Sequence, residues 1–255
     1  MKKVLWISLL LLMACAPNPY TQRNQFLLTS EAQEIALGAE AFAQIFSEVP
    51  PSQDRALQEQ LQRVGQRLVQ ASGRTDYAWE FVVLEDPENP NAFALPGGKV
   101  AVYTGLFPMI DSDAELAAVV GHEIAHVLLR HGGERISRGL VTDLIEAGLL
   151  KASEQSMPEE RVQIIRLAYG VGSTLAVELP FSRQQEIEAD RLGLMLMAQA
   201  GYHPRAALDF WSRMAAQGGP VQLPEFLSTH PLDANRLRIL EQTLPEAMKL
   251  YSQGN

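Results

Sequence analysis

The chain has 255 residues, of which 47% are hydrophobic and 20% are charged, a composition typical of a globular protein that can bury a sizeable core. Its net charge is −9, and the Lys and Arg residues are scattered along the chain, which argues against a nucleic-acid partner and against a polybasic membrane patch. We therefore expect one folded domain, with at most a small appendage, that binds no nucleic acid.

The N-terminus has the pattern of a secretory signal. Lys2 and Lys3 precede an apolar run over residues 4–14 that is too short to span a bilayer comfortably. Cys15, the single cysteine, follows Leu-Met-Ala and resembles the lipid-modified cysteine of bacterial lipoproteins, although the methionine replaces a small residue. Ordinary signal cleavage after Ala16 is the alternative, and it would discard the cysteine.

These features predict three parts of the chain. Residues 1–14 are expected to be a lipoprotein signal peptide, residues 15–28 a polar tether that begins with the lipidated cysteine, and residues 29–250 the folded domain. Because Ala16, and not an aspartate, follows Cys15, the sorting pattern of lipoproteins favours the periplasmic side of the outer membrane. The lipid would then be the contact with the membrane.

The spacing of apolar residues predicts a mainly helical (α+β) fold with a small sheet. Apolar residues recur every three or four positions in Ser30 to Phe46 and in Ser52 to Ala71, which predicts two amphipathic helices. Trp79 to Leu84 is predicted as a strand, and Ala92 to Leu95 with Val100 to Thr104 as a hairpin around a Pro-Gly-Gly turn. Further helices are predicted at Asp113 to Arg130, Glu134 to Leu150, Glu159 to Val177, Gln184 to Ala200, Arg205 to Ala216 and Ala234 to Leu244.

One of these predicted helices contains the motif HEIAH. His122 and His126 are four residues apart, so on a helix they project from the same face, one turn from each other. Two imidazoles at this spacing can bind one zinc ion, and the carboxylate of Glu123 can deprotonate a water held by that ion. The alternative is a pair of core histidines bonded to neighbouring groups, with a glutamate at the edge of the helix.

A catalytic zinc usually takes three protein ligands, so the two histidines need another. The metzincin pattern, in which a third histidine follows the motif, is excluded because Leu129 and Gly132 stand where its Gly and His belong. His131 is five residues past the second motif histidine, well round the helix. We expect it to lie behind the ligands or at the surface.

The better candidate for a third ligand lies downstream, in SRQQEIEADRLG. Glu186 and Asp190 are four residues apart and share a face of a predicted helix, whereas Glu188 points to a different side. Glu186 could bind zinc, while Asp190 could accept a hydrogen bond from a ligand imidazole and fix its tautomer. The alternative is a solvated acidic helix start, favoured by the helix dipole.

Four motifs in this order resemble the gluzincin family of the CAAX prenyl protease, HtpX and the BepA-type periplasmic proteases: NAFALPGGKVAVYTGL, HEIAH, SRQQEIEADRLG and STHPLDANRL. The similarity covers Thr29 to Leu244, and it implies a mostly helical metallopeptidase with a small sheet beside the active site. No transmembrane helices or helical repeats are expected, as in the small lipoprotein members. By motif match the family roles are zinc ligand for His122, His126 and Glu186, general base for Glu123, partner of a ligand for Asp190, and transition-state stabilisation for His230 and Arg236.

The resemblance implies one zinc per chain and an endopeptidase that cleaves unfolded or misassembled cell-envelope proteins in quality control, with the outer-membrane assembly machinery as an expected partner. An edge strand can take up an extended peptide as a further strand, so we expect Asn91, Ala92 and Phe93 to contact substrate. His230 could instead occupy the open zinc position and make the enzyme latent. The alternatives are a zinc-bound chaperone or scaffold that does not cleave, and a structural lipoprotein with a coincidental motif.

Overall fold

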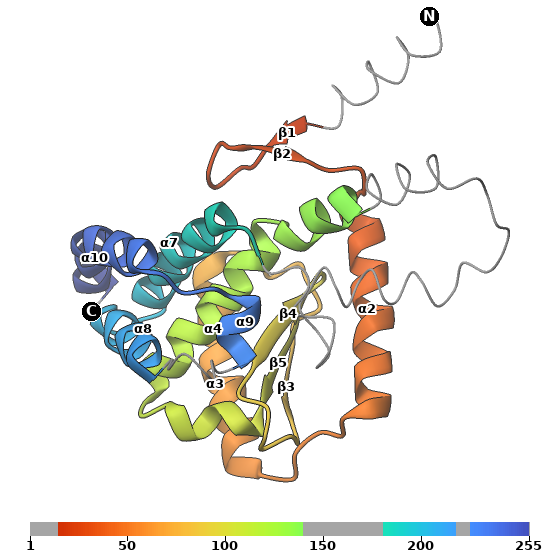
Figure 1. Cartoon of the computed structure of the whole chain (residues 1–255), viewed down its shortest axis with the longest axis horizontal. Helices are drawn as coiled ribbons and strands as arrows, with labels where there is room; N and C mark the ends of the chain where they lie inside the picture. Colours follow the sequence, from red (N-terminus) through yellow and green to blue (C-terminus); the bar gives the residue numbers. More distant parts are fainter. Residues whose placement is uncertain (1–14, 140–180, 218–224, 255) are drawn as a thin grey trace, which may run out of the picture.

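The computed structural model describes residues 15–139, 181–217 and 225–254 (Figure 1). Within them the fold is mainly helical with a small sheet, which confirms the expected fold class. The predicted signal peptide, the predicted helix from Glu159 to Val177 and most of the one from Glu134 to Leu150 lie outside the described residues. In the part of the chain that is described, no helix is long and apolar enough to cross a membrane.

Every predicted element that falls within the described residues is found there, with shifted ends. The helices are α2 (Glu31–Glu48), α3 (Arg55–Ser72), α4 (Asp113–Leu128), α7 (Arg183–Gln199), α8 (Arg205–Gln217), α9 (Glu225–Thr229), α10 (Ala234–Gly254) and the 3₁₀ helix η1 (Thr104–Met109). The strands are β1 (Cys15–Pro17), β2 (Asn24–Phe26), β3 (Glu80–Leu84), β4 (Ala92–Leu95) and β5 (Lys99–Tyr103). The sequence did not predict β1, β2, η1 or α9.

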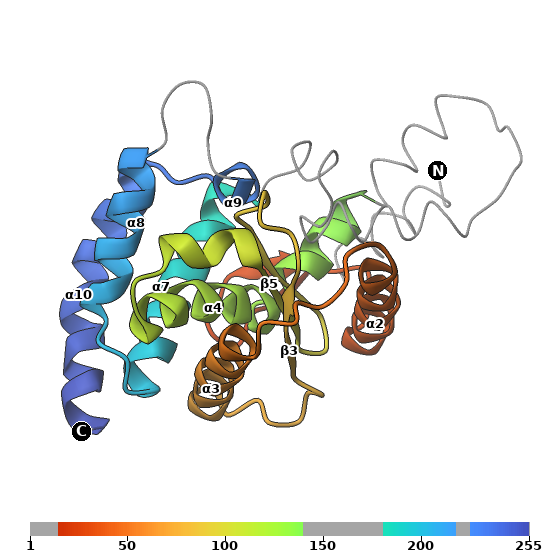
Figure 2. The same ribbon diagram turned by 90° about the horizontal axis from the view of Figure 1, so that it is seen from below.

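A three-stranded sheet is covered by helices on both faces (Figure 2). Its strand order is β3-β5-β4, with β3 parallel and β4 antiparallel to β5, so β4 lies at an edge. Successive side chains of a strand point to opposite faces. Phe93 and Leu95 accordingly pack with α2, while Ala92 and Ala94 belong to the larger core of α3 and α4.

Helices α4 and α7 approach each other closely because glycine stands where they cross. A Cβ atom added to Gly193 would lie 2.9 Å from the backbone nitrogen of His122, and one added to Gly121 would lie 3.2 Å from the carbonyl oxygen of Gly193. Both distances are shorter than side chains ordinarily allow. The contact places the face of α7 that carries Glu186 and Asp190 against the face of α4 that carries His122 and His126.

Helix α4 ends two residues earlier than predicted, and the chain turns sharply there. Arg130 adopts a left-handed backbone conformation, with φ of 51°, and a new helical segment begins at residue 131. This conformation is uncommon outside glycine. Its guanidinium donates to Glu34 Oε1 at 2.6 Å and to the Thr29 carbonyl at 2.9 Å, which fixes the turn.

The segment expected to be a polar tether instead forms a hairpin, β1/β2, that packs on the domain. Asn18 and Gln25 are buried, and both side-chain amides donate to the carbonyl oxygen of Leu129, at 3.2 and 2.7 Å. Carbonyl groups at the end of a helix have no partner within it, so these amides satisfy the end of α4. The polar segment is therefore ordered on the folded domain. Lipidation of Cys15, at the start of this segment, stays a prediction.

Candidate metal centre

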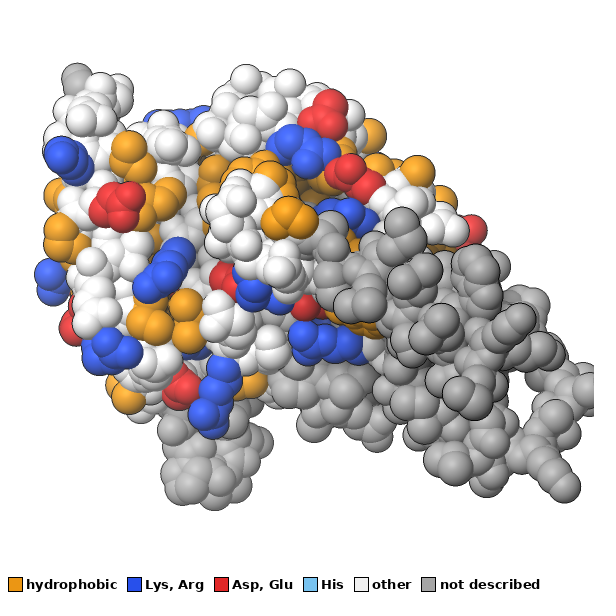
Figure 3. Space-filling model, turned by 90° about the horizontal axis from the view of Figure 1, so that it is seen from above, with side chains coloured by type: hydrophobic (Ala, Val, Ile, Leu, Met, Phe, Trp, Pro, Cys, Tyr) orange, Lys and Arg blue, Asp and Glu red, His pale blue; other side chains and the backbone are white. Residues whose placement is uncertain are grey.

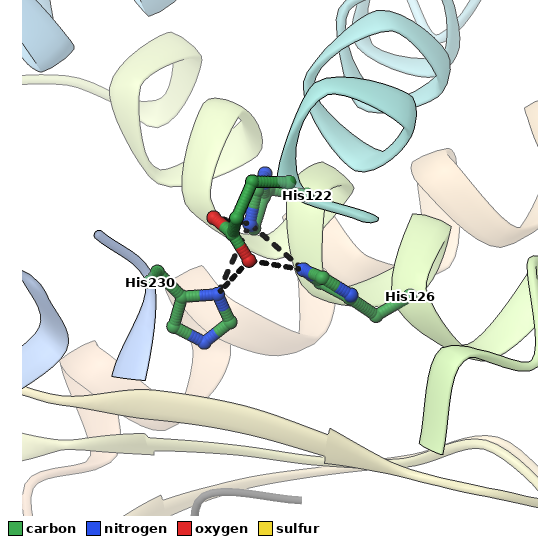
Figure 4. A group of neighbouring side chains, drawn as sticks. His122, His126 and His230 are labelled. Carbon is green, nitrogen blue, oxygen red and sulfur yellow. Dashed lines mark hydrogen bonds and ion pairs between the residues drawn. The ribbon is translucent and has the colours of Figure 1, made fainter. Parts of the chain in front are cut away.

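Three histidines and one glutamate converge at the centre of the molecule. His122 and His126 come from α4, Glu186 from α7 and His230 from the segment after α9, and the three labelled imidazoles point toward one another in Figure 4. His122 Nε2 lies 3.0 Å from His126 Nε2 and 3.2 Å from His230 Nδ1. Glu186 Oε1 lies 3.3 Å from His126 Nε2 and 3.1 Å from His230 Nδ1. All four side chains are buried.

This donor set fits a zinc ion. Ligand atoms about 2.0–2.1 Å from a tetrahedral zinc are themselves roughly 3.3 Å apart. The neighbouring donors here are separated by 3.0 to 3.4 Å, and no pair among the four is more than 4.8 Å apart. Imidazole nitrogen and carboxylate oxygen are also donors that zinc prefers.

The protonation states of the cluster bear on metal binding. Burial would raise the pKa of Glu186, but the positive charges of Arg236, His230 and His122 outweigh it and hold that pKa well below 4.5. Burial lowers the pKa of His126 well below 6.5. For His122 the effect of burial is overcome by Glu186 and Asp190, which raise its pKa to about 9. A metal must therefore displace a proton from His122. His126 is already neutral and Glu186 already ionised, so these two groups can bind the metal directly.

Glu123 lies between the cluster and the edge of the sheet. Its carboxylate is buried, and Oε1 lies 3.4 Å from His230 Nε2. Burial raises the pKa of Glu123 above 4.5, while neighbouring positive charges and the backbone N–H of Ala94 in β4 act in the opposite direction. A carboxylate with a raised pKa accepts a proton more readily at neutral pH, as a general base requires.

Asp190 and Arg236 lie behind the ligands. Asp190 Oδ1 is 3.0 Å from His122 Nδ1, the arrangement predicted from the sequence. Arg236 binds both oxygens of Asp190 at 2.7 Å, approaches Glu186 Oε2 to 2.6 Å, and donates to the carbonyl oxygens of His230 and Pro231. Its guanidinium thus holds two acidic groups and the segment of His230 together, a role that the sequence did not indicate. Transition-state stabilisation by Arg236 stays a prediction.

His131 is fully buried and contacts a ligand. Its Nδ1 lies 2.9 Å from His126 Nδ1, and its Nε2 lies 3.1 Å from Glu188 Oε2. Burial would raise the pKa of Glu188, but hydrogen bonds from His131, Arg23 and Gln184 outweigh it and hold that pKa at about 2. No sequence pattern indicated that Glu188 or Arg23 belongs to this site.

The three residues expected to contact substrate lie at the sheet edge. Among the described strands, β4 pairs only with β5, so its other side remains an edge. Asn91, Ala92 and Phe93 are nonetheless buried, and the Phe93 ring packs on Tyr103 with ring centroids 6.0 Å apart. Phe93 faces α2 and not the metal cluster, so a substrate could contact this residue only through its backbone.

The comparison with known proteins identifies the family. Residues 55–244 match Peptidase family M48. The chain belongs to this family. The match confirms the expected class, a metallopeptidase of the gluzincin type, and with the four-donor cluster it confirms zinc as the cofactor. The two histidines of HEIAH are thus not merely core residues.

Individual relatives are mitochondrial and bacterial. The chain is 38% identical to "Mitochondrial metalloendopeptidase OMA1" of Schizosaccharomyces pombe over 90% of its own length and 66% of that protein. It is 31% identical to the Saccharomyces cerevisiae protein of the same name, over 93% of its own length and 71% of that protein. It is 32% identical to "Putative beta-barrel assembly-enhancing protease" of Vibrio cholerae, over 80% of its own length but only 43% of that protein.

The expected location is wrong. The relatives that cover 90% and 93% of the chain are mitochondrial proteins, which argues against a lipid-anchored protein on the periplasmic side of the outer membrane. The location rested on a charged start, a short apolar run and the residue after Cys15. These local features of the N-terminus do not outweigh matches that extend over nearly the whole chain.

Proposed function

We propose that the chain is a zinc-dependent endopeptidase that cleaves extended segments of unfolded or misassembled polypeptides. The observation that carries this proposal is the buried carboxylate of Glu123 beside the cluster of His122, His126, Glu186 and His230. The relatives named metalloendopeptidase or beta-barrel assembly-enhancing protease support peptide-bond hydrolysis.

In the proposed mechanism, His122, His126 and Glu186 would hold zinc, which would supply Lewis acidity to the scissile carbonyl and to the attacking water. Glu123 accepts a proton from that water at its carboxylate and then delivers the proton to the leaving amine. The carboxylate of Asp190, 3.0 Å from His122 Nδ1, would accept a hydrogen bond from that nitrogen and so keep Nε2 free to bind the metal. His230 and Arg236 are proposed to stabilise the charge that develops in the transition state.

The substrate is proposed to bind at the edge of β4. An extended peptide can pair there with backbone groups of residues 91–95, on the side opposite β5. Because the N–H of Ala94 faces Glu123, a peptide at this edge would pass close to the general base. This mode favours segments without stable structure, because a folded protein does not offer a free strand.

We also propose that the described conformation is a latent one, with His230 as a fourth zinc ligand. Its Nδ1 lies as close to Glu186 and His122 as those ligands lie to each other. With His230 added, the site would offer four protein donors, the number of a structural zinc site, and would leave no position for water. Activity would then require His230 to move away. The sequence Gly-Gly-Pro at residues 218–220 would suit a hinge for this movement, and it lies outside the described residues.

The proposed function is tested by separating the base from the ligands. Glu123→Gln should retain one zinc per chain and lose nearly all cleavage of casein, whereas His126→Ala should lose both zinc and cleavage. Glu241→Gln, an exposed change on α10, is the matched control and should behave as the wild type. Full activity in Glu123→Gln would refute the mechanism. A wild-type chain that binds zinc and cleaves nothing would instead favour the alternative of a zinc-bound chaperone or scaffold.

A further inference from the structure

Each motif histidine of α4 is supported from behind by a carboxylate of α7. His122 contacts Asp190, which Arg236 binds with two hydrogen bonds. On the other side of the cluster, His126 is supported by a longer series of contacts, and the first of these is with the imidazole of His131. The series runs through His131, Glu188 and Arg23, and it ends in the β1/β2 hairpin.

The contacts along this second support are short and buried. His126 Nδ1 lies 2.9 Å from His131 Nδ1, and His131 Nε2 lies 3.1 Å from Glu188 Oε2. The other oxygen of Glu188 accepts from Arg23 Nε at 2.6 Å and from Gln184 Nε2 at 2.9 Å. His126, His131 and Glu188 are 3%, 0% and 5% exposed, so solvent does not compete strongly for these bonds.

The proton positions along the chain of contacts are mutually consistent. A neutral imidazole that binds metal through Nε2 carries its proton on Nδ1. His126 therefore donates from Nδ1, and His131 Nδ1 must accept. The proton of His131 is then on Nε2, from which it donates to Glu188. Reversal of either bond would take the Nδ1 proton from His126, so the two bonds fix the tautomer that binds zinc.

Arg23 provides the positive charge that this arrangement requires. Its Nη1 and Nη2 atoms bind the two oxygens of Glu134 at 2.8 Å, while Nε binds Glu188. Without Arg23, Glu188 would lose its guanidinium partner. Glu134 would keep, among the described residues, only the exposed Arg138, so two largely buried carboxylates would lie together with too little positive charge, which is unfavourable. Figure 3, which views the molecule from above Figure 1, shows basic side chains beside acidic ones on this face.

The outer end of the support can be reached from solvent. A hollow of about 690 Å³ lies between the turn of the hairpin, α7 and α10, and Arg23 and Glu188 are among the residues that line it. The side chain of Arg23 is 23% exposed, in contrast to the buried His131. Arg23 can therefore be replaced with less disturbance of the core than His131.

We propose that His131 and Glu188 are positioning residues for the zinc ligand His126, and that docking of the β1/β2 hairpin through Arg23 is required for tight retention of zinc. The inference rests on the zinc site of the proposed function. It gives the hairpin, which precedes the expected domain, a direct role in the metal centre. Release of the hairpin from Glu134 and Glu188 would loosen His126 without touching any ligand.

The test measures zinc affinity in the full chain by competition with a chromogenic chelator. We expect Arg23→Ala, Glu188→Gln and His131→Leu each to weaken zinc binding about 10- to 100-fold, the range found when the partner of a ligating histidine is removed. His131→Asn should lose less than His131→Leu, because its amide oxygen can still accept from His126 Nδ1. Arg63→Ala is the control, since it breaks a more exposed arginine–carboxylate pair, with Asp113 at the first residue of α4, that does not reach the metal ligands. It should leave zinc affinity unchanged.

The outcomes separate this inference from the proposed function. Zinc affinity within twofold of the wild type in both Arg23→Ala and His131→Leu overturns the inference, whether or not the enzyme cleaves peptides. A wild-type chain that binds no zinc overturns the proposed function instead. If His131→Leu does not fold, Arg23→Ala decides, with the visible spectrum of the cobalt-substituted protein as a second measurement. An unchanged spectrum together with unchanged affinity refutes the positioning role.

Discussion

His230 lies within reach of both the proposed ligands and the proposed base. Its Nδ1 is 3.1 Å from Glu186 and its Nε2 is 3.4 Å from Glu123. The ring of Phe226 stacks on His230 with centroids 4.6 Å apart and an interplanar angle of 15°, and Phe181 lies 5.1 Å away. Movement of His230 away from the cluster would break these contacts, so the imidazole is held in place by packing as well as by charge.

The latent arrangement predicts opposite effects of His230→Ala on two measurements. Turnover should fall, because a donor to the transition state is lost, while hydroxamate inhibitors should bind more tightly, because a zinc position becomes free. Steady-state kinetics and inhibitor titration check this result. Arg236→Ala is the comparison, and it should lower turnover with no gain in inhibitor affinity. Equal inhibitor affinity in His230→Ala and the wild type would contradict the latent arrangement.

Arg236 is a second residue whose replacement should lower the stability of the fold by a predictable amount. It is 1% exposed and neutralises Asp190 and Glu186, so Arg236→Ala should lower the free energy of unfolding by about 3–5 kcal/mol, as expected for a broken buried ion pair. Chemical denaturation measures this difference. Arg205→Ala removes an exposed pair with Asp209 within α8 and should cost about 0.3–0.5 kcal/mol. Similar losses in the two variants would show that Arg236 is not the neutralising group.

Helix spacing predicted His122, His126 and Glu186 for a local reason, whereas His230 came from the resemblance to a family. His122 and His126 share a face because a helix repeats every 3.6 residues, and the same rule pairs Glu186 with Asp190. His131 breaks the rule, because the left-handed turn at Arg130 carries it off the helix of His126. That turn depends on Glu34, which is 96 residues away in the chain. No local pattern contains such a contact.

At the scale of elements, the short distance between α4 and α7 places the ligands His122 and His126 of α4 against the ligand Glu186 of α7. Gly193→Ala would push a methyl group to within 2.9 Å of the His122 backbone, so the helices must separate. We expect a loss of about 1–3 kcal/mol in unfolding free energy, as for other overpacked sites, together with weaker zinc binding. Denaturation and chelator competition measure the two effects. Gly254→Ala at the end of α10, where an added Cβ meets nothing within 4 Å, should change neither.

The ends of elements were predicted less well than their existence. The last helix was expected to stop at Leu244, directly before Pro245, a residue that cannot donate a backbone hydrogen bond to the helix. Helix α10 continues to Gly254, and Ala247, Leu250 and Tyr251 pack against the main core. Tertiary packing thus outweighs one lost hydrogen bond. The β1/β2 hairpin was missed for a related reason, since its buried amides bind a carbonyl that only the folded domain provides.

At the scale of the whole molecule, the proposed metal centre joins segments that are far apart in the chain. Helix α4 carries two ligands, α7 carries the third, and the segment after α9 carries His230. The hairpin and α10 reach the same centre through Arg23 and Arg236. A bound ion would therefore cross-link α4, α7 and the segment after α9, whereas the metal-free site brings several buried ionisable groups together.

Removal of zinc should consequently lower the stability of the entire fold. A ligand present at 100 to 1,000 times its Kd stabilises the native state by about 2.7–4.1 kcal/mol, which for a domain of this size corresponds to a shift in Tm on the order of 10 °C. Thermal unfolding with and without a chelator measures the shift. Glu123→Gln should show the full shift, because Glu123 is not proposed as a ligand, while Glu186→Ala should show almost none. A chelated wild type, verified to contain no zinc, that melts at the temperature of the loaded protein would contradict a cross-linking role for the metal.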